Sequence, residues 1–274
     1  MALFKTLKPL LSSAAIALFV ILAMTNKAYS QSYWTYFTYD FDGCQPKSLT
    51  YSGDAFFPSD STFLRLTKTN GSGIPQPGSI GRVLRSKPIQ FHGQWARASF
   101  ETTINFTISS TPGDNNPADG LVFFIAPVGY VFPAGSGGSN FGVYNQSGLA
   151  PNVFAVEFDM YVNSEWDPNF RHIGINIGSR NSSNVTKLEG TDGQLVSARI
   201  CYVAATRLIT VYATAAAGKF EVSYVYDLSN LLFQMVQVGI AASSGVHVAV
   251  HDVATWYFSS FVAVGKQDAK IFKF

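Results

Sequence analysis

Ligand-type side chains gather in one short segment, residues 157–172. In chain order they are Glu157, Asp159, Tyr161, Asn163, Asp167 and His172. Alternate positions of an extended strand share a face, and neighbouring carboxylates there repel each other unless a cation neutralises them. Carboxylate, amide and backbone oxygens suit Ca²⁺, whereas carboxylates with one imidazole suit Mn²⁺ or a related transition metal. The spacing predicts a metal site in which Asp159 and Asp167 can bridge two ions. The alternative is a polar strand face held by hydrogen bonds and solvent.

The elements that would position this segment are strands. No helical period of useful length appears beyond residue 31. Alternation at Phe100, Ile104 and Ile108 predicts a half-buried strand, and the continuous apolar run 121–126 predicts a strand buried on both faces. Further strands are predicted at residues 153–161, 172–177, 196–203, 207–213, 220–226, 236–242 and 253–258. Their spacing predicts one all-β domain, an antiparallel sandwich or jelly roll.

Three long irregular segments separate the predicted strands. They cover residues 111–119, 127–151 and 163–171 and are rich in Gly, Pro, Asn and Ser. Loops of this length in a compact β domain are usually functional or disordered. We therefore expect these segments to lie outside the core and two of them to contribute to the site.

The N-terminal segment has the pattern of a secretory signal peptide. Lys5 and Lys8 supply a basic start, residues 14–24 are apolar, and small residues precede a cleavage site at Gln31. The apolar run is shorter than the roughly 20 residues of a membrane-spanning helix, which favours a cleaved peptide over an anchor. We expect residues 1–30 to be removed, and residues 31–274 to form a mature domain without a membrane span.

Charge argues against a nucleic-acid partner. The whole chain carries 19 Lys and Arg against 17 Asp and Glu, but Lys5, Lys8 and Lys27 belong to the predicted signal peptide. The mature chain then has 16 basic and 17 acidic residues. No basic stripe remains that would follow a phosphate backbone.

Cysteines and glycosylation sequons agree with a secretory route. Cys44 and Cys201 can form one bridge in an oxidising compartment or remain as buried thiols, and the sequence leaves both open. Five candidate glycosylation sites begin at Asn70, Asn105, Asn145, Asn181 and Asn184.

Several motifs, in order along the chain, resemble those of one family. Residues 156–175, VEFDMYVNSEWDPNFRHIGI, resemble the metal-binding signature of the legume lectins. Agreement continues at residues 52–55, 83–88, 117–127, 137–144, 241–245 and 251–258. Any one of these motifs is modestly specific, but the resemblance covers nearly all of residues 33–262. It implies a concanavalin A-like jelly-roll sandwich of antiparallel sheets, no enzymatic activity and recognition of glycans.

The resemblance also implies ligands for two metal ions. The transition metal, Mn²⁺ or a related ion, would be held by Glu157, Asp159, Asp167 and His172, with Ser182 reached through water. Ca²⁺ would be held by Asp159, the Tyr161 carbonyl, Asn163 and Asp167. Both ions would then be cofactors of binding.

A sugar site is implied next to these ions. Asp119 and Asn163 would bond sugar hydroxyls, and Tyr161 would stack its ring on the sugar. A backbone N–H of Gly138 or Ser139 would add a third bond. Val246 and His247 belong to the segment 244–250, whose length resembles that of mannose/glucose binders. By the same analogy the peptide bond between Ala118 and Asp119 is expected to be cis.

Partners and location follow from the resemblance as expectations. Glycans and glycoproteins are the expected ligands, and family members form homodimers or homotetramers, in which multivalency would crosslink glycans. The secretory pathway would deliver the protein to the extracellular space, the apoplast of a plant, or to the vacuole.

Three other functions fit parts of the pattern. Glu157-Phe-Asp159 begins like the catalytic strand of jelly-roll glycoside hydrolases, but the third acid is missing, and a retaining mechanism needs two carboxyls about 5 Å apart. A storage or defence protein of the same family that has lost sugar binding is the main alternative. The ectodomain of a receptor kinase would fit only a truncated chain.

Overall fold

Alternation of buried and exposed side chains builds the longest strands. The computed structural model describes residues 33–264 except residues 44, 60, 94–95 and 115, so the predicted signal peptide lies outside the described residues. In β7 (Ala96–Ser109), Phe100, Ile104 and Phe106 point inward and their neighbours outward. This pattern confirms the half-buried strand predicted there, because one face of the sheet packs against a second sheet.

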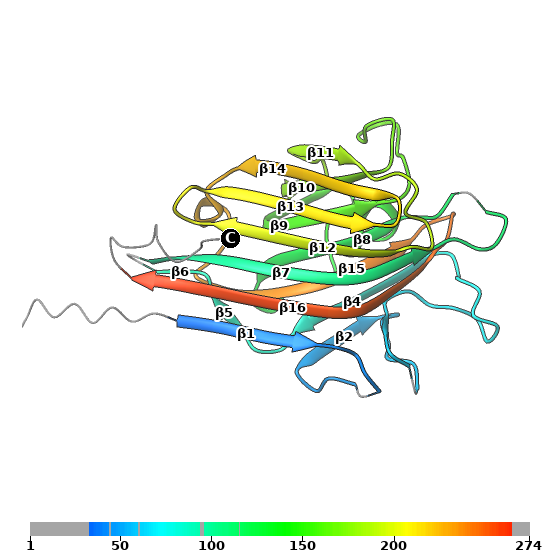
Figure 1. The fold of residues 1–274 in the computed structure, drawn as a ribbon, viewed down its shortest axis with the longest axis horizontal. Helices are drawn as coiled ribbons and strands as arrows, with labels where there is room; N and C mark the ends of the chain where they lie inside the picture. The colour runs from blue at the N-terminus through cyan, green and yellow to red at the C-terminus, as the bar shows by residue number, and fades with distance from the viewer. Residues whose placement is uncertain (1–32, 44, 60, 94–95, 115, 265–274) are drawn as a thin grey trace, which may run out of the picture. The chain divides into compact units, whose positions relative to one another are not determined.

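Two antiparallel sheets form the sandwich (Figure 1). The back sheet has the order β1 (Tyr33–Tyr39), β16 (Val250–Val264), β7, β12 (Leu195–Val203), β13 (Leu208–Ala215) and β14 (Gly218–Val225), with β3 (Leu64–Arg65) beside β16 and β6 (His92–Gly93) beside β7. The front sheet has the order β11 (Asn184–Lys187), β10 (His172–Ser179), β9 (Leu149–Asp159), β8 (Gly120–Pro127), β15 (Met235–Ser244), β4 (Ser79–Arg85) and β2 (Leu49–Gly53), with β5 (Ile89–Gln90) beside β15. The predicted all-β jelly-roll architecture is confirmed.

Register across the front sheet aligns four strand ends in one row. Ser243 of β15 pairs with Gly120 of β8, Gly120 pairs with Asp159 of β9, and Asp159 pairs with His172 of β10. Neighbouring strands are antiparallel, so the start of β8 meets the end of β9 and the start of β10. This row positions the residues that the sequence marked for metal and ligand binding.

The front sheet has a core on each of its faces. Phe123 and Ile125 of β8 pack between the sheets, whereas Val122, Phe124 and Ala126 belong to a second buried cluster. The strand buried on both faces is therefore confirmed for residues 121–126.

The prediction that residues 127–151 lie outside the core is wrong. Phe141, Val143 and Tyr144 are fully buried in the second cluster and pack with Leu84 and Val153. The reason is that this segment folds over the outer face of the front sheet and supplies the apolar cover that the sheet requires. It contains the 3₁₀ turn η1 (Gly138–Asn140), and a second such turn, η2 (Leu228–Asn230), follows β14.

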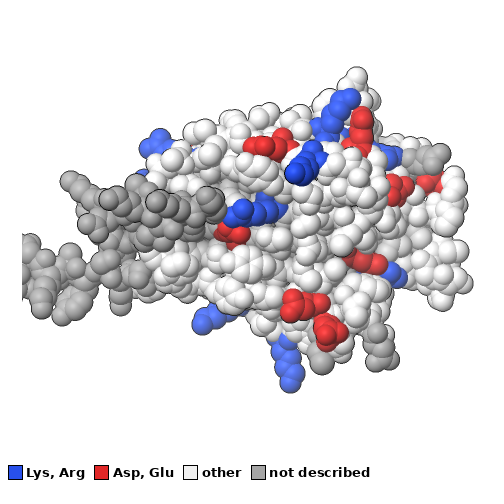
Figure 2. All heavy atoms as spheres, in the orientation of Figure 1, with Lys and Arg blue, Asp and Glu red and all other residues white. Residues whose placement is uncertain are grey.

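Charged side chains are sparse on the face seen in Figure 2, and Lys and Arg are interspersed with Asp and Glu. Within the described residues, no helix has the length and apolar character needed to span a bilayer.

Candidate functional site

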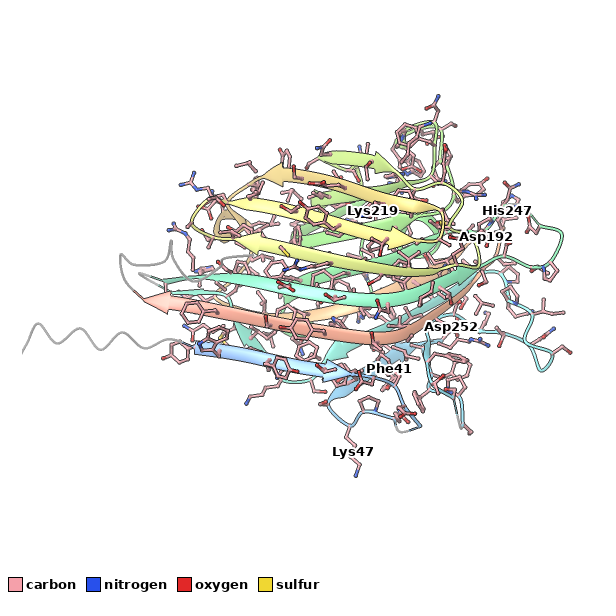
Figure 3. The ribbon with its side chains drawn as sticks, in the orientation of Figure 1. Phe41, Lys47, Asp192, Lys219, His247 and Asp252 are labelled. Carbon is pink, nitrogen blue, oxygen red and sulfur yellow. The ribbon has the colours of Figure 1, made fainter. Side chains whose placement is uncertain are left out.

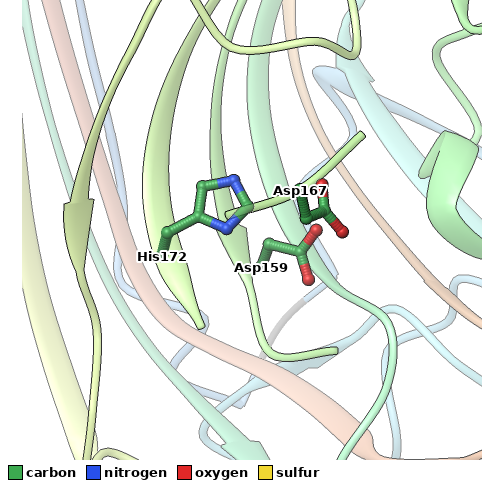
Figure 4. Close-up of side chains that lie close together, drawn as sticks. All are labelled: Asp159, Asp167 and His172. Carbon is green, nitrogen blue, oxygen red and sulfur yellow. The ribbon is translucent and has the colours of Figure 1, made fainter. Parts of the chain in front are cut away.

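Two carboxylates and one imidazole converge at the end of the front sheet (Figure 4). Asp159 ends β9, His172 begins β10, and Asp167 lies in the loop that connects them. One potential ligand atom from each residue lies within 4.8 Å of those of the other two. Asp159 and His172 are buried. The sequence therefore identified three side chains that the fold places together.

Glu157 extends this cluster one step along β9. Its Oε1 accepts a hydrogen bond from Ser182 Oγ at 2.6 Å and lies 3.2 Å from His172 Nε2. Gly174 faces Glu157 across the β9–β10 pair, and a Cβ there would lie 2.0 Å from Ser182 Oγ and 2.7 Å from Glu157 Oε1. A side chain at this position would displace Ser182 or Glu157, so glycine leaves room for both polar side chains.

The prediction that residues 157–163 form one continuous strand face is wrong beyond Asp159. β9 ends at Asp159, and the chain turns because Tyr161 N–H donates to Asp159 Oδ1 at 2.8 Å. Asn163 N–H in turn donates to Asp167 Oδ2 at 2.7 Å. Tyr161 and Asn163 therefore reach the site from the loop, residues 160–171, which we call the metal loop.

Burial sets the electrostatics of the three aspartates in the site. Desolvation raises the pKa of Asp119 to about 7 and that of Asp167 to about 6. Desolvation, with Glu157 next, raises the pKa of Asp159 well above its usual value. These shifts mean that the carboxylates are costly to ionise together in a dry environment, and a bound divalent cation would reverse that cost.

Asp119 lies next to this cluster at the start of β8, after a cis peptide bond from Ala118, as expected. Its backbone N–H donates to Ser243 O at 2.8 Å, and its carbonyl accepts from Met160 N–H at 2.9 Å. The side chain is buried, yet its Oδ2 has no hydrogen-bond partner among the described residues. A buried carboxylate oxygen of this kind is an acceptor available to a ligand.

Glycine backbone surrounds the Asp119 carboxylate. The nearby Gly245 backbone N–H partly offsets the rise in the pKa of this carboxyl, and a Cβ added at Gly245 or Gly138 would lie 3.2 Å or 3.7 Å from Oδ2. Gly138 also accepts a hydrogen bond from Ser243 Oγ at 2.5 Å, and Ser139 follows it in η1. The predicted residues Gly138 and Asp119 are thus brought together, and Gly245 is a neighbour that sequence reasoning missed.

His247 and Tyr161 stack on each other beside this group. Their ring centroids are 5.1 Å apart at an interplanar angle of 28°. Val246, on the same loop, has 93% of its surface exposed, and Figure 3 shows His247 at the same end of the sandwich as Asp192. The aromatic ring expected to contact a sugar therefore already has an aromatic partner.

The donor set fits the two expected ions. Asn163 Oδ1 is buried without a hydrogen-bond partner among the described residues, as an oxygen reserved for a cation would be. With Asp159, Asp167 and the Tyr161 carbonyl it would supply the oxygen ligands that Ca²⁺ prefers. Glu157, Asp159, Asp167 and His172 would hold a transition metal, with Ser182 beside Glu157.

The predicted glycosylation asparagines differ in their exposure. Asn70, Asn181 and Asn184 are exposed, whereas Asn105 and Asn145 are half-buried. Glycosylation at any of these positions stays a prediction. Cys44 lies outside the described residues, and Cys201 is a free, half-buried thiol whose pKa burial raises to about 11.

Two further contact residues could not be found from the sequence. Arg180 follows β10, and its guanidinium lies over the Trp166 ring at 3.6 Å from the centroid. The same side chain donates to Asn140 Oδ1 at 2.9 Å. Trp166 lies within the motif of residues 156–175 but had no role assigned, and no motif or periodicity marks Arg180, because its contacts join separate segments of the chain.

Comparisons with known proteins agree with this geometry. Residues 34–271 match the family model described as the legume lectin domain. Agglutinin-2 of Cladrastis kentukea is 35% identical over 94% of this chain and 91% of its own length. An alpha-methyl-mannoside-specific lectin of Arachis hypogaea is 34% identical, with 95% and 94% coverage.

Solved structures show the same relationship. Basic winged bean lectin, solved with Tn-antigen, superimposes with a TM-score of 0.77 at 33% identity, covering 83% of this chain and 98% of its own. Arcelin-5, a lectin-like defence protein from Phaseolus vulgaris, has a TM-score of 0.74 at 24% identity, with 83% and 98% coverage, and shares the fold. The match of sequence, fold and site over most of the chain shows that this protein belongs to the legume lectin family.

Proposed function

We propose that this protein is a carbohydrate-binding lectin whose glycan site depends on Ca²⁺ and a transition metal. The observation that carries the proposal is the Asp119 carboxylate, which is buried and whose Oδ2 has no hydrogen-bond partner among the described residues, next to the backbone of Gly138 and Gly245. A sugar hydroxyl can donate to such a carboxylate while it accepts from a backbone N–H. Tyr161 supplies the aromatic surface that the apolar face of a sugar ring requires.

The metal ions would act by fixing this arrangement, not by chemistry on the sugar. Bound cations would neutralise Glu157, Asp159 and Asp167 and order the metal loop. Asn163, which belongs to that loop, then presents its amide beside Asp119. The protein's role in the proposal is binding, and the site has no assigned catalytic residue.

For the sugar, we propose the mannose/glucose class. The length of the segment 244–250 and the similarity to the alpha-methyl-mannoside-specific lectin support it. A galactose-type ligand is the competing outcome, because similar solved lectins were determined with galactose and with GalNAc. Secretion to the apoplast or vacuole, and glycans or glycoproteins as partners, complete the proposal.

A glycan array tests both parts. The purified protein is applied with Ca²⁺ and Mn²⁺, and again after acid demetallation in EDTA, next to the variant Asp119→Asn. We expect binding to mannose-terminated glycans only with the ions present, and loss of at least tenfold in affinity for D119N. Far-ultraviolet circular dichroism shows that each sample is folded. A folded, metal-loaded protein that binds no glycan would instead support the storage or defence function.

A further inference from the structure

Arg180 occupies the junction between two loops of the site. It follows β10 directly, and its backbone is fixed on both sides: its N–H donates to Gly148 O at 2.9 Å, and its carbonyl accepts from Asn176 Nδ2 at 2.9 Å. The side chain passes over Gly148, where an added Cβ would lie 2.5 Å from Arg180 Nε. A side chain held in this way has few alternative rotamers and can hold other groups in place.

The guanidinium connects groups from two different loops. It lies over the Trp166 ring at 3.6 Å from the centroid, and Trp166 immediately precedes Asp167 in the metal loop. Its Nη1 donates at 2.9 Å to Asn140 Oδ1, and Asn140 ends the turn η1 that begins with Gly138. A planar cation can do both because its face stacks on the ring while its edge donates.

Asn140 connects Arg180 to the backbone of the glycine-rich loop, residues 135–148. Its Nδ2 donates to Gly135 O at 3.0 Å, and its carbonyl accepts from Val143 and Tyr144 N–H at 2.8 Å and 3.0 Å. Asn140 itself is buried. The position of Arg180 therefore affects the backbone that carries Gly138 and Ser139.

We propose that Arg180 is a positioning residue that couples the metal loop to the glycine-rich loop, so that an ion bound by the metal loop orders the Gly138–Ser139 backbone beside Asp119. This inference rests on the proposed function of the site. Arg180 would act without contacting the sugar or an ion. Its effect passes through Trp166 on one side and Asn140 on the other.

Hydrogen exchange measured by mass spectrometry tests the coupling without any sugar. The full chain is compared with and without Ca²⁺ and Mn²⁺, as wild type and as Arg180→Met, which keeps an unbranched apolar side chain but removes the cation and its donors. In the wild type we expect the ions to slow exchange at least tenfold in both residues 159–167 and residues 138–144. In R180M the protection should remain at 159–167 and be lost at 138–144.

Two further variants separate coupling from stability. Arg97→Met is a control that removes an arginine far along β7 from the loop that leads to Asp119. Arg97 Nε donates to Ser229 Oγ at 3.1 Å. We expect this variant to show the same ion-dependent protection as the wild type in both segments. Arg180→Lys keeps a cation over Trp166, so it reports on the coupling if R180M does not fold, and should retain protection at 159–167 while reducing that at 138–144.

The outcomes distinguish this inference from the proposed function. Equal ion-dependent protection at residues 138–144 in the wild type and the folded Arg180 variant would overturn the coupling but leave metal binding intact. Ion-dependent protection of residues 159–167 without protection of residues 138–144 in the wild type would also overturn the coupling. No ion-dependent protection in either segment of the wild type would remove the metal dependence itself, and the coupling with it.

Discussion

His251 shows how burial fixes the charge of one residue. Its imidazole is fully buried in β16, with Nδ1 3.0 Å from Thr67 Oγ1 and no partner for Nε2 among the described residues. Burial lowers the pKa of His251 to about 3, against about 6.5 in an unfolded chain. A histidine with a depressed native pKa binds a proton on unfolding, so its contribution to stability is complete above pH 6.5 and falls as the pH drops towards 3.

We therefore expect the free energy of unfolding to fall on acidification through His251. At pH 4.5 this residue alone should cost up to about 3 kcal/mol relative to pH 7. Urea unfolding of the wild type and His251→Asn at both pH values measures it. The variant, which keeps a polar group near Thr67, should lose correspondingly less stability between the two pH values. An equal loss in both proteins would show that His251 does not titrate in this way.

The stacked pair of His247 and Tyr161 makes a separate prediction about affinity. An aromatic pair contributes about 0.5–1.5 kcal/mol beyond its buried area, so His247→Ala should weaken sugar binding roughly fivefold by releasing the Tyr161 ring. His247→Phe preserves a ring at this position and should retain most of the affinity. Isothermal titration with the sugar that the array identifies compares the three proteins, and unchanged binding by H247A would contradict a role for the stack.

Among the elements, the pairing of β9 with β10 positions the candidate metal ligands. Gly174→Ala would force a methyl group against Ser182 Oγ and Glu157 Oε1. We expect the Mn²⁺ affinity of this variant to fall at least tenfold, as measured by titration of the metal-free protein. Gly71→Ala, where an added Cβ meets nothing within 4 Å, is the matched control and should bind Mn²⁺ normally. A Mn²⁺ affinity equal to that of the control would show that Ser182 and Glu157 can move aside without consequence.

Strand periodicity and residue spacing predicted those features that depend on residues close together in the sequence. Alternation in β7 and the apolar run in β8 identified their buried faces, and the acidic segment identified Asp159, Asp167 and His172. The end of β9 was misjudged because Tyr161 and Asn163 continue the alternation after a side-chain hydrogen bond has turned the backbone.

Contacts between distant segments account for the remaining differences. Residues 127–151 carry the Gly, Pro and Asn of a loop, and only the outer face of the front sheet makes Phe141 and Tyr144 core residues. His251 lies in β16 and is fully buried, and no local pattern in the sequence indicated that burial. Arg180 was missed for the same reason, since its two partners lie in different loops.

For the whole molecule, we expect ion binding to raise the melting temperature, Tm. A ligand that binds only the folded state at about 100 times its dissociation constant contributes about 2.7 kcal/mol, so two ions contribute about 5 kcal/mol. In a domain of this size we expect Ca²⁺ and Mn²⁺ together to raise Tm by roughly 10–20 °C in differential scanning calorimetry. EDTA should reverse the change, and Asp159→Asn should remove most of it. A Tm that is independent of the ions would argue against a folded-state metal site.

The position of β16 has a consequence for how the protein is made. β16, near the end of the chain, lies between β1 and β7 in the back sheet, and Tyr33 pairs with Val262. During translation β1 is therefore made long before its partner strand, β16. Until β16 emerges from the ribosome, β1 and β7 both expose unpaired backbone edges, which are templates for aggregation. Contacts of such long sequence separation also slow folding, so the newly made chain would be a natural client of chaperones.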